Sequence, residues 1–259
     1  MVIGKSEKIF KLVTISTLFF IILFFISVII SMVFYLDSYT FISTLLSKEI
    51  IFAIKLSMVT ATIATLISLI IGVPSAYALS RTEFIGKNII DALLDLPIVL
   101  SPIALGAALL IFFSIDKMPL GDYFVFEVSG IIVAQFTIVS ALTIRLMKST
   151  FDSIDPNYEN VARTLGYSKS QAFFKVTLPL SKNGLIASSI LAWARAIGEF
   201  GATVTLAGAT KMKTETLPIA IFLSLQSAEV EKAISVIFIL IFLALITLII
   251  FRKIGGNWL

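Results

Sequence analysis

The stretch from Ser149 to Asn183, STFDSIDPNYENVARTLGYSKSQAFFKVTLPLSKN, is the longest polar interruption in a chain built mainly of apolar runs. Its turn and capping residues predict a short helix. Asp155 can cap a helix whose first residue is Pro156, and Gly166 stands where a left-handed residue commonly follows a helix end. We therefore expect a short helix of about three turns, closed by a glycine, between two membrane spans.

A second helix is predicted in the same stretch. Ser168 is followed three residues later by Gln171, which is a capping-box pattern, and we expect this helix to end before Pro179. Both helices carry a small apolar face. That of the first consists of Val161, Ala162 and Leu165, and that of the second of Phe173, Phe174 and Val176. We expect the second face to be buried against the ends of the neighbouring spans.

The composition of the chain indicates that lipid rather than water surrounds most of it. Of its 259 residues 58% are hydrophobic and 14% charged, against roughly 45 to 50% and about 25% in soluble domains. The mean hydropathy is +1.05, so we expect an all-α membrane protein with several spans. Cysteine and histidine are absent, which excludes disulfides, thiol nucleophiles, imidazole bases and the common zinc sites. A net charge of +4 in dispersed residues argues against a nucleic-acid surface.

Six apolar runs are long enough to cross a bilayer core of about 30 Å. They cover residues 9–35, 50–79, 89–114, 127–149, 183–208 and 231–251. The first run is too long for a signal peptide and lacks a small-residue cleavage pattern. Lys and Arg lie mostly beside one set of span ends, which predicts that both termini and the 149–183 loop are cytoplasmic.

The fifth run contains two charges at membrane depth. In ARAIGEFGAT, residues 194–203, Arg195 and Glu199 are four residues apart and can pair on one helix face. Each costs about 2.5 to 3.5 kcal/mol at a helix centre, so both should face the bundle interior or a water-lined path. Two interpretations stay open: a pair that locks the span to its neighbours, or an anion path or gate that uses Arg195. Gly198 and Gly201 should allow close approach of another backbone.

Three further features carry weaker signals. Small residues at helical spacing in the second run, which we expect to pack helices rather than line a pore, are Ser57, Ala61, Ala64, Ser68 and Gly72. Asp91 and Asp95 lie on one helix without an acidic partner from a second, so catalysis by them is not expected. Pro74, Pro97 and Pro102 should bend or interrupt the second and third runs.

The polar loop resembles the EAA loop of ABC importer permeases. The residues that carry the resemblance are Glu159, Asn160, Val161, Ala162, Arg163, Thr164, Leu165 and Gly166, followed thirteen residues after the glycine by Pro179. Asn160 and Val161 replace the Glu and Ala of the general motif, and a glutamate stands one place earlier, as in the molybdate and sulfate branches. The resemblance implies a coupling helix that docks in a groove of a cytoplasmic ATPase subunit.

Other segments are similar to the molybdate branch of that family. They are Arg195, Gly198, Glu199, Gly201 and Thr203 in the fifth run, residues 216–221, and residues 91–102. The resemblance implies one permease domain over residues 1–259 in the plasma membrane, and a function of moving molybdate or tungstate inward by alternating access. Implied partners are two ATPase subunits, a second permease copy in a homodimer, an extracytoplasmic binding protein and membrane lipid.

No cofactor is expected in this chain, because its sequence contains no G-x-x-x-x-G-K-[ST] motif. ATP and Mg are expected on the partner ATPase. Two alternatives stay open: a sulfate or thiosulfate permease of the same family, and an ATP-independent channel or secondary transporter. The second would usually show inverted repeats or several intramembrane ionisable groups, which are not apparent. A membrane enzyme is disfavoured, since no catalytic or metal-binding set is present.

Overall fold

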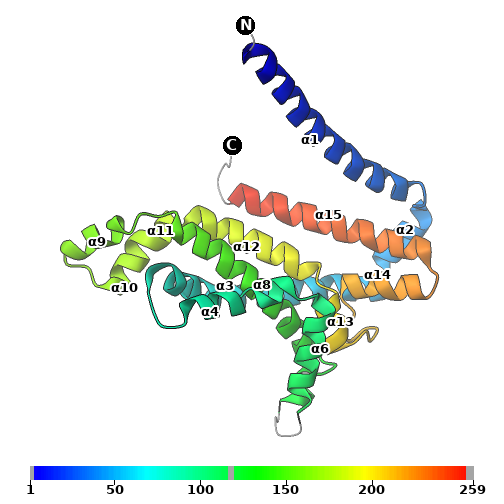
Figure 1. Cartoon of the computed structure of the whole chain (residues 1–259). Helices are drawn as coiled ribbons and strands as arrows, with labels where there is room; N and C mark the ends of the chain where they lie inside the picture. Colours follow the sequence, from blue (N-terminus) through cyan, green and yellow to red (C-terminus); the bar gives the residue numbers. More distant parts are fainter. Residues whose placement is uncertain (1–2, 116–119, 255–259) are drawn as a thin grey trace.

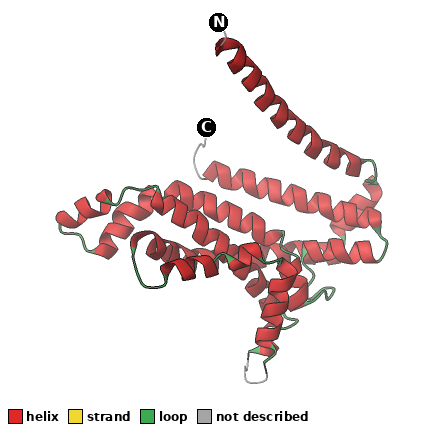
Figure 2. Ribbon diagram, in the orientation of Figure 1, coloured by secondary structure: helices red, strands yellow, loops and turns green. Residues whose placement is uncertain are grey.

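The structure, a computed structural model, describes residues 3–115 and 120–254, and these residues form helices and loops without a strand (Figure 2). In chain order the helices are α1 (Ile3–Val33), α2 (Ser38–Leu46), α3 (Lys48–Arg81), α4 (Lys87–Leu93), α5 (Leu96–Val99), α6 (Pro102–Phe113), α7 (Gly121–Phe124), α8 (Val128–Asp152), α9 (Asn157–Thr164), α10 (Lys169–Ala172), the π-helix η1 (Phe173–Thr177), α11 (Leu178–Leu180), α12 (Lys182–Ile197), α13 (Gly201–Ala207), α14 (Leu217–Gln226) and α15 (Val230–Ile254). The expected all-α class is confirmed.

Four described helices, α1, α3, α8 and α15, are long and apolar enough to cross a membrane. Two more spans exist only if a bent pair counts as one: α4 and α5 with α6, bent by 111°, and α12 with α13, bent by 56°. The break in the third run agrees with the interruption predicted from its prolines, whereas the break in the fifth run was not predicted. Helices α2 and α14 were not predicted.

Proline affects the second and third runs differently. Helix α3 continues without a break through Pro74, so the predicted interruption there is not seen. Pro102 opens α6 directly after a break, and Ser101 caps that helix by accepting a hydrogen bond from the Ala104 N–H at 3.2 Å. A proline at the first helical position needs no hydrogen-bond partner, which is why it begins a helix without cost.

Helices α3 and α8 lie side by side at the centre of the bundle, with α12 against both (Figure 1). Ser68 donates to the Thr143 hydroxyl at 2.7 Å, and a Cβ on Gly72 would lie 2.9 Å from a Thr143 methyl. All members of the small-residue stripe are buried: Ser57, Ala61, Ala64, Ser68 and Gly72. The stripe packs helices, as predicted.

The C-terminal end of helix α1 lies next to the bundle, and the helix extends away from the bundle toward the N-terminus (Figure 1). None of the residues in its apolar window is buried within the chain. Large side chains such as Phe19 and Phe20 are exposed. An apolar surface of this length suits the hydrocarbon of a bilayer.

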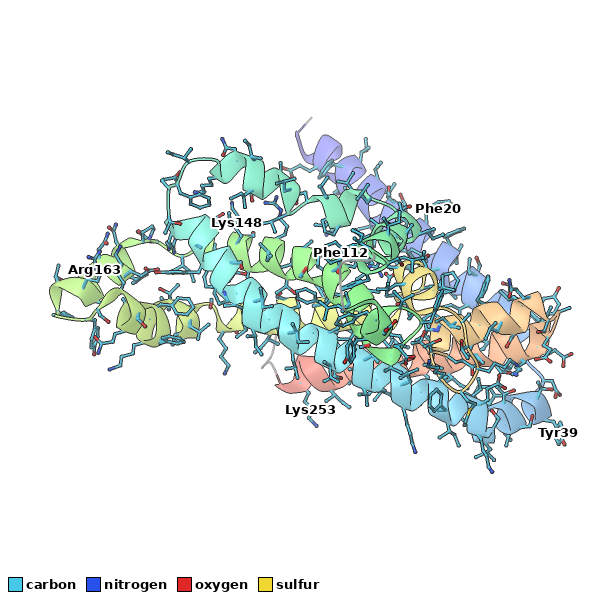
Figure 3. All side chains as sticks on the ribbon, turned by 90° about the horizontal axis from the view of Figure 1, so that it is seen from below. Phe20, Tyr39, Phe112, Lys148, Arg163 and Lys253 are labelled. Carbon is cyan, nitrogen blue, oxygen red and sulfur yellow. The ribbon has the colours of Figure 1, made fainter. Side chains whose placement is uncertain are left out.

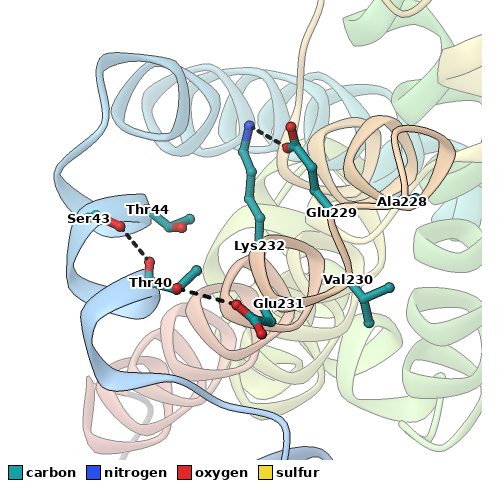
Figure 4. Close-up of a pocket in the computed structure, with 8 residues that line it drawn as sticks. All are labelled: Thr40, Ser43, Thr44, Ala228, Glu229, Val230, Glu231 and Lys232. Atoms are coloured by element: carbon teal, nitrogen blue, oxygen red, sulfur yellow. Dashed lines mark hydrogen bonds and ion pairs between the residues drawn. The ribbon is translucent and has the colours of Figure 1, made fainter.

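The bundle has two ends, which we name by what they carry. The loop end carries residues 149–183, and the far end carries α2 and residues 208–216. At the far end Glu49 accepts ion pairs from Lys232 at 2.9 Å and Lys211 at 3.0 Å. Beside them a polar hollow opens between α2 and the start of α15 (Figure 4). Its lining residues are Thr40, Ser43, Thr44, Ala228, Glu229, Val230, Glu231 and Lys232.

Candidate functional site

The first loop helix, α9, is held at its start by Asp155. The Asp155 carboxylate accepts a hydrogen bond from the Asn157 N–H at 2.9 Å. The N-cap is Pro156 and the helix begins at Asn157, so the predicted cap at Asp155 is wrong by one residue, although Asp155 still bonds the first residue of the helix. Such one-residue differences are usual at helix ends.

The end of α9 is a left-handed turn at Gly166, whose φ is +93°. Two backbone hydrogen bonds close it: Gly166 N–H to the Arg163 carbonyl at 3.0 Å, and Tyr167 N–H to the Ala162 carbonyl at 3.2 Å. This pattern is a Schellman motif, in which glycine avoids the Cβ penalty of the left-handed region. The prediction for Gly166 is confirmed.

The second loop helix begins as predicted and ends later. Ser168 and Gln171 form both bonds of the capping box, at 2.9 and 3.2 Å. The helix does not end before Pro179, because α10 continues through η1 into α11. In the π segment the Leu178 N–H reaches back to the Phe173 carbonyl, and Pro179 then falls in the first turn of α11. There its missing N–H breaks no bond.

The loop exposes one apolar face and buries part of another. Val161 is 58% exposed and Leu165 76% exposed, whereas Ala162 is buried. Phe173 packs on the Tyr77 ring with centroids 4.6 Å apart, but Phe174 is exposed, so its predicted burial is wrong. Consecutive residues of a helix point about 100° apart, so Phe173 can face the bundle while Phe174 faces outward.

Beside Val161 the surface is hollowed. The lining residues are Asp155, Asn157, Tyr158 and Val161. Asn160, Arg163, Thr164 and Pro179 are also exposed, and Figure 3 shows Arg163 at the tip of the molecule. Most of the predicted coupling residues therefore stand on a free surface of α9.

Two of the predicted residues face inward instead: Ala162 is buried, and the side chain of Glu159 is only 13% exposed. One carboxylate oxygen accepts from the Tyr77 hydroxyl at 2.7 Å. The other accepts from Arg81 Nε at 3.1 Å and the Thr177 hydroxyl at 2.7 Å. Burial disfavours the charged carboxylate, but these hydrogen bonds and the Arg81 charge outweigh it and hold the pKa of Glu159 below its usual value.

Arg81 extends this tie to the end of α8. Its Nη2 donates to the carbonyls of Phe151 at 2.8 Å and Ile154 at 2.7 Å. One guanidinium therefore joins α3, the C-terminal end of α8 and, through Glu159, α9. We call this set of contacts the Arg81 tie. The sequence contained both charges but no signal for their pairing.

The break between α12 and α13 carries the predicted pair. Arg195 Nη1 lies 2.5 Å from a Glu199 carboxylate oxygen, and the other oxygen accepts from the Ala202 N–H at 3.0 Å. The Glu199 side chain is 1% exposed, and that of Arg195 38%. Glu199 thus accepts a hydrogen bond from the first turn of α13, while the Arg195 side chain stays partly exposed.

The two breaks meet in space, where α6 and α13 pack together away from the long axis of the bundle (Figure 1). A Cβ on Gly201 would lie 2.8 Å from Pro102 Cβ, and one on Gly106 would lie 2.7 Å from the Ala202 Cα. The close approach predicted at Gly201 is confirmed. At Gly198 the nearest such atom is 3.7 Å away, so the same prediction for Gly198 is wrong.

Thr203, also in the predicted set, is fully buried on α13. Within the described part of the chain its hydroxyl oxygen has no hydrogen-bond partner. We refer to Ser101, Arg195, Glu199, Gly201 and Thr203, with their neighbours on α6, as the paired breaks. Broken helices at membrane depth are tolerated where they are covered by protein or line a cavity.

Asp91 and Asp95 meet a basic side chain of α8 rather than another acid. Arg145 Nη1 lies 2.7 Å from the Asp91 carboxylate, Nη2 donates to the Asp91 carbonyl at 2.6 Å, and Nε donates to the Asp95 carboxylate. Both acids are therefore ion-paired. The signal in the sequence for this contact is the arginine itself, a charged residue within the apolar run 127–149.

Comparison with known proteins gives the family. Residues 68–255 match the family described as binding-protein-dependent transport system inner membrane component. A probable molybdenum ABC transporter permease of Haloferax volcanii is 37% identical over 78% of this chain and 74% of its own length. A molybdate/tungstate transport system permease protein of Methanocaldococcus jannaschii is 35% identical over 92% of this chain and 96% of its own.

A bacterial alginate ABC transporter, solved in complex with a periplasmic protein bound to an alginate pentasaccharide, shares the fold. The TM-score is 0.79 over 98% of this chain and 97% of that one, at 16% identity. Together with the apolar helices and the broken spans, these similarities place the protein in a membrane, which it crosses several times. The chain belongs to the family of binding-protein-dependent transport system inner membrane components, the permease subunits of ABC importers.

Proposed function

We propose that this chain is the membrane subunit of an ATP-driven importer that carries molybdate or tungstate into the cytoplasm. The observation that carries the choice of cargo is the 35% identity, over 92% of the chain, to a protein named for molybdate/tungstate transport. Family membership supports the importer class. Tetrahedral oxyanions of this kind carry two negative charges, so their path needs positive charge with little competing acid.

The paired breaks are the proposed path or gate. Glu199 is buried and already neutralised by Arg195, whereas the Arg195 side chain is 38% exposed and an arginine has five N–H donors, more than this one contact uses. Discontinuous helices commonly form the binding region of transporters near the membrane midplane. Gly198, Gly201 and Thr203 are the small residues we assign to this region, with Gly201 in contact with α6.

Helix α9 is the proposed coupling helix. Its exposed Val161 and Leu165 supply an apolar contact for an ATPase subunit, next to the hollow that Tyr158 lines. Asn160, Arg163 and Thr164 surround that contact, and Gly166 and Pro179 fix the geometry of the turn and of the second helix. Glu159 and Ala162 face inward and attach the helix to the bundle. ATP and Mg belong to the partner subunit in this proposal, and the permease itself performs no chemistry.

The complete transporter is proposed to contain two copies of this chain, two ATPase subunits and an extracytoplasmic binding protein. The loop end and both termini then face the cytoplasm, in agreement with the distribution of Lys and Arg. The far end faces the binding protein. Helix α1 contacts lipid, and this assignment is supported by the exposure of its apolar side chains.

Molybdate uptake by cells with and without this gene tests the cargo. We expect uptake to depend on the gene and to persist in a large excess of sulfate. Uptake abolished by sulfate would move the chain to the sulfate branch, and uptake independent of the gene would refute the cargo assignment. In vesicles, transport without ATP would instead support the channel or secondary-transporter alternative.

A further inference from the structure

The first half of the third run, α4 and α5, forms an arm that packing alone does not hold. Neither helix contains a buried residue. Ile89 and Leu93 are exposed on it, and Leu94 is only partly buried against the core of α3 and α8. We call residues 87–99 the α4–α5 arm. Because the arm buries so little apolar surface, its position depends largely on polar contacts.

Arg145 supplies those contacts. From α8 it reaches two side chains and one carbonyl of the arm, and its own side chain is 27% exposed. Asp91 and Asp95 lie one helical turn apart, so a planar guanidinium can grip both at once. The other ion pair of this region, Lys87 with Glu83, joins residues four apart and ties the arm to no other helix.

The C-terminal end of α8, beyond Arg145, is held by the Arg81 tie. From Arg145, helix α8 continues to Asp152, and Arg81 holds the carbonyls of Phe151 and Ile154 at its end. Through Glu159 that guanidinium also holds α9. A displacement of α9 should therefore also move α8. Helix α8 in turn holds the α4–α5 arm, which is followed along the chain by the break at Ser101.

We propose that Arg145 is a positioning residue that fastens the α4–α5 arm to α8, so that movement of the loop end is transmitted to the paired breaks. The proposal rests on the proposed function of α9 as coupling helix. Arg145 acts through the arm and does not contact the transported anion. A lysine at this position could form one or two of the contacts but not the planar grip of all three.

The test uses the absence of cysteine from the chain. Spin labels on Ile89→Cys and Ser153→Cys, both exposed positions, report the distance between the arm and the end of α8. The complex of full-length chain, ATPase and binding protein is reconstituted in lipid. Distances are measured without nucleotide and with ATP trapped, and molybdate uptake and ATP hydrolysis are measured in the same vesicles without labels.

In the wild type we expect a narrow distance distribution that is the same in both nucleotide states, because the arm follows α8. In Arg145→Gln the distribution should broaden, and uptake per ATP hydrolysed should fall about tenfold. Arg145→Lys should lie between the two. Lys148→Gln is the matched control, since Lys148 is on the same helix but pairs with Asp152 of α8 itself at 3.1 Å. It should leave both readouts unchanged.

A triple variant guards against misfolding. In Arg145→Gln with Asp91→Asn and Asp95→Asn no charge is left unpaired, so the chain should insert and assemble while the arm stays loose. A wild-type distance distribution in the single or the triple variant would overturn the proposal. If the wild-type complex takes up no molybdate, the proposed function is refuted instead. The distances would still decide the role of Arg145.

Discussion

The loop end and the paired breaks each contain an Arg–Glu ion pair, but the pairs join different things. At the loop end Arg81 and Glu159 come from α3 and α9, which are far apart in the sequence. At the breaks Arg195 and Glu199 lie four residues apart across the end of one helix. The first pair ties separate elements together, whereas the second neutralises a charge within a single segment.

The contacts around each pair differ in the same way. At the loop end Tyr77 and Thr177 add hydrogen bonds between elements. At the breaks α6 and α13 meet at glycines: Gly106 lies against Ala202, and Gly201 lies against Pro102. None of these four residues carries a charge. Separation at the loop end would break ion pairs, while sliding at the breaks would change only van der Waals contacts. The loop end is suited to transmit force and the breaks are suited to move.

The largest effect is expected from Glu159→Ala, because it leaves Arg81 nearly buried without its carboxylate. We expect a loss of about 3 kcal/mol in the free energy of unfolding and loss of coupled transport. Denaturant titration in detergent and uptake in vesicles measure the two. Glu159→Gln keeps acceptor and shape and should lose less. If Glu159→Ala is as stable as the wild type, the Arg81–Glu159 pair does not tie the loop end together. The contrast between the loop end and the paired breaks would then be lost.

Arg195→Ala tests the other pair. Glu199 would stay buried beside the Ala202 N–H with one oxygen unpaired, at a cost of about 2 kcal/mol. We expect the complex to assemble and uptake to fall strongly, as measured with labelled molybdate. Arg195→Lys retains the charge and serves as the control. If Arg195→Ala transports normally, the pair has no part in an anion path.

Gly106→Ala tests whether the breaks depend on close backbone contact. The new methyl group would lie 2.7 Å from Ala202 Cα, and such overpacking costs about 1 to 2 kcal/mol. We expect a lower thermal transition and slower uptake. Gly198→Ala is the matched control, because its methyl group would meet its nearest atom at 3.7 Å. Similar losses in both variants would show that the glycine contacts are not specific.

The smallest effect is expected from Gly166→Val. No atom lies within 4 Å of its Cβ position, so only the left-handed backbone at φ +93° resists the change. The cost is about 1 kcal/mol, and we expect weaker coupling of hydrolysis to uptake with the spans still inserted. Gly166→Asn tolerates this conformation better and should retain more coupling. Unchanged coupling in Gly166→Val would count against a docking role for α9.

The loop was predictable from sequence because its structure is local. The capping box at Ser168 and the glycine turn at Gly166 each depend on residues only a few positions apart. The end of the second helix was missed because a π segment accommodates Pro179. Nothing in the pattern of apolar residues distinguishes that segment from an ordinary helix end.

The breaks and the ties were not predictable in the same way. Pro102 marked a break correctly and Pro74 did not, since the surrounding helices decide whether a proline interrupts a span. The ion pairs of Arg81 with Glu159 and of Arg145 with Asp91 and Asp95 join residues fifty or more positions apart. A single sequence shows such charges but not the helix packing that selects their partners.

The most direct test measures ATP hydrolysis and molybdate uptake together, in vesicles that contain the complete transporter. For Glu159→Ala we expect hydrolysis that no longer responds to anion-loaded binding protein, with uptake lost. For Arg195→Ala we expect hydrolysis that still responds, although uptake is lost. If Arg195→Ala loses the response while Glu159→Ala keeps it, the loop end does not transmit and the paired breaks are not the path.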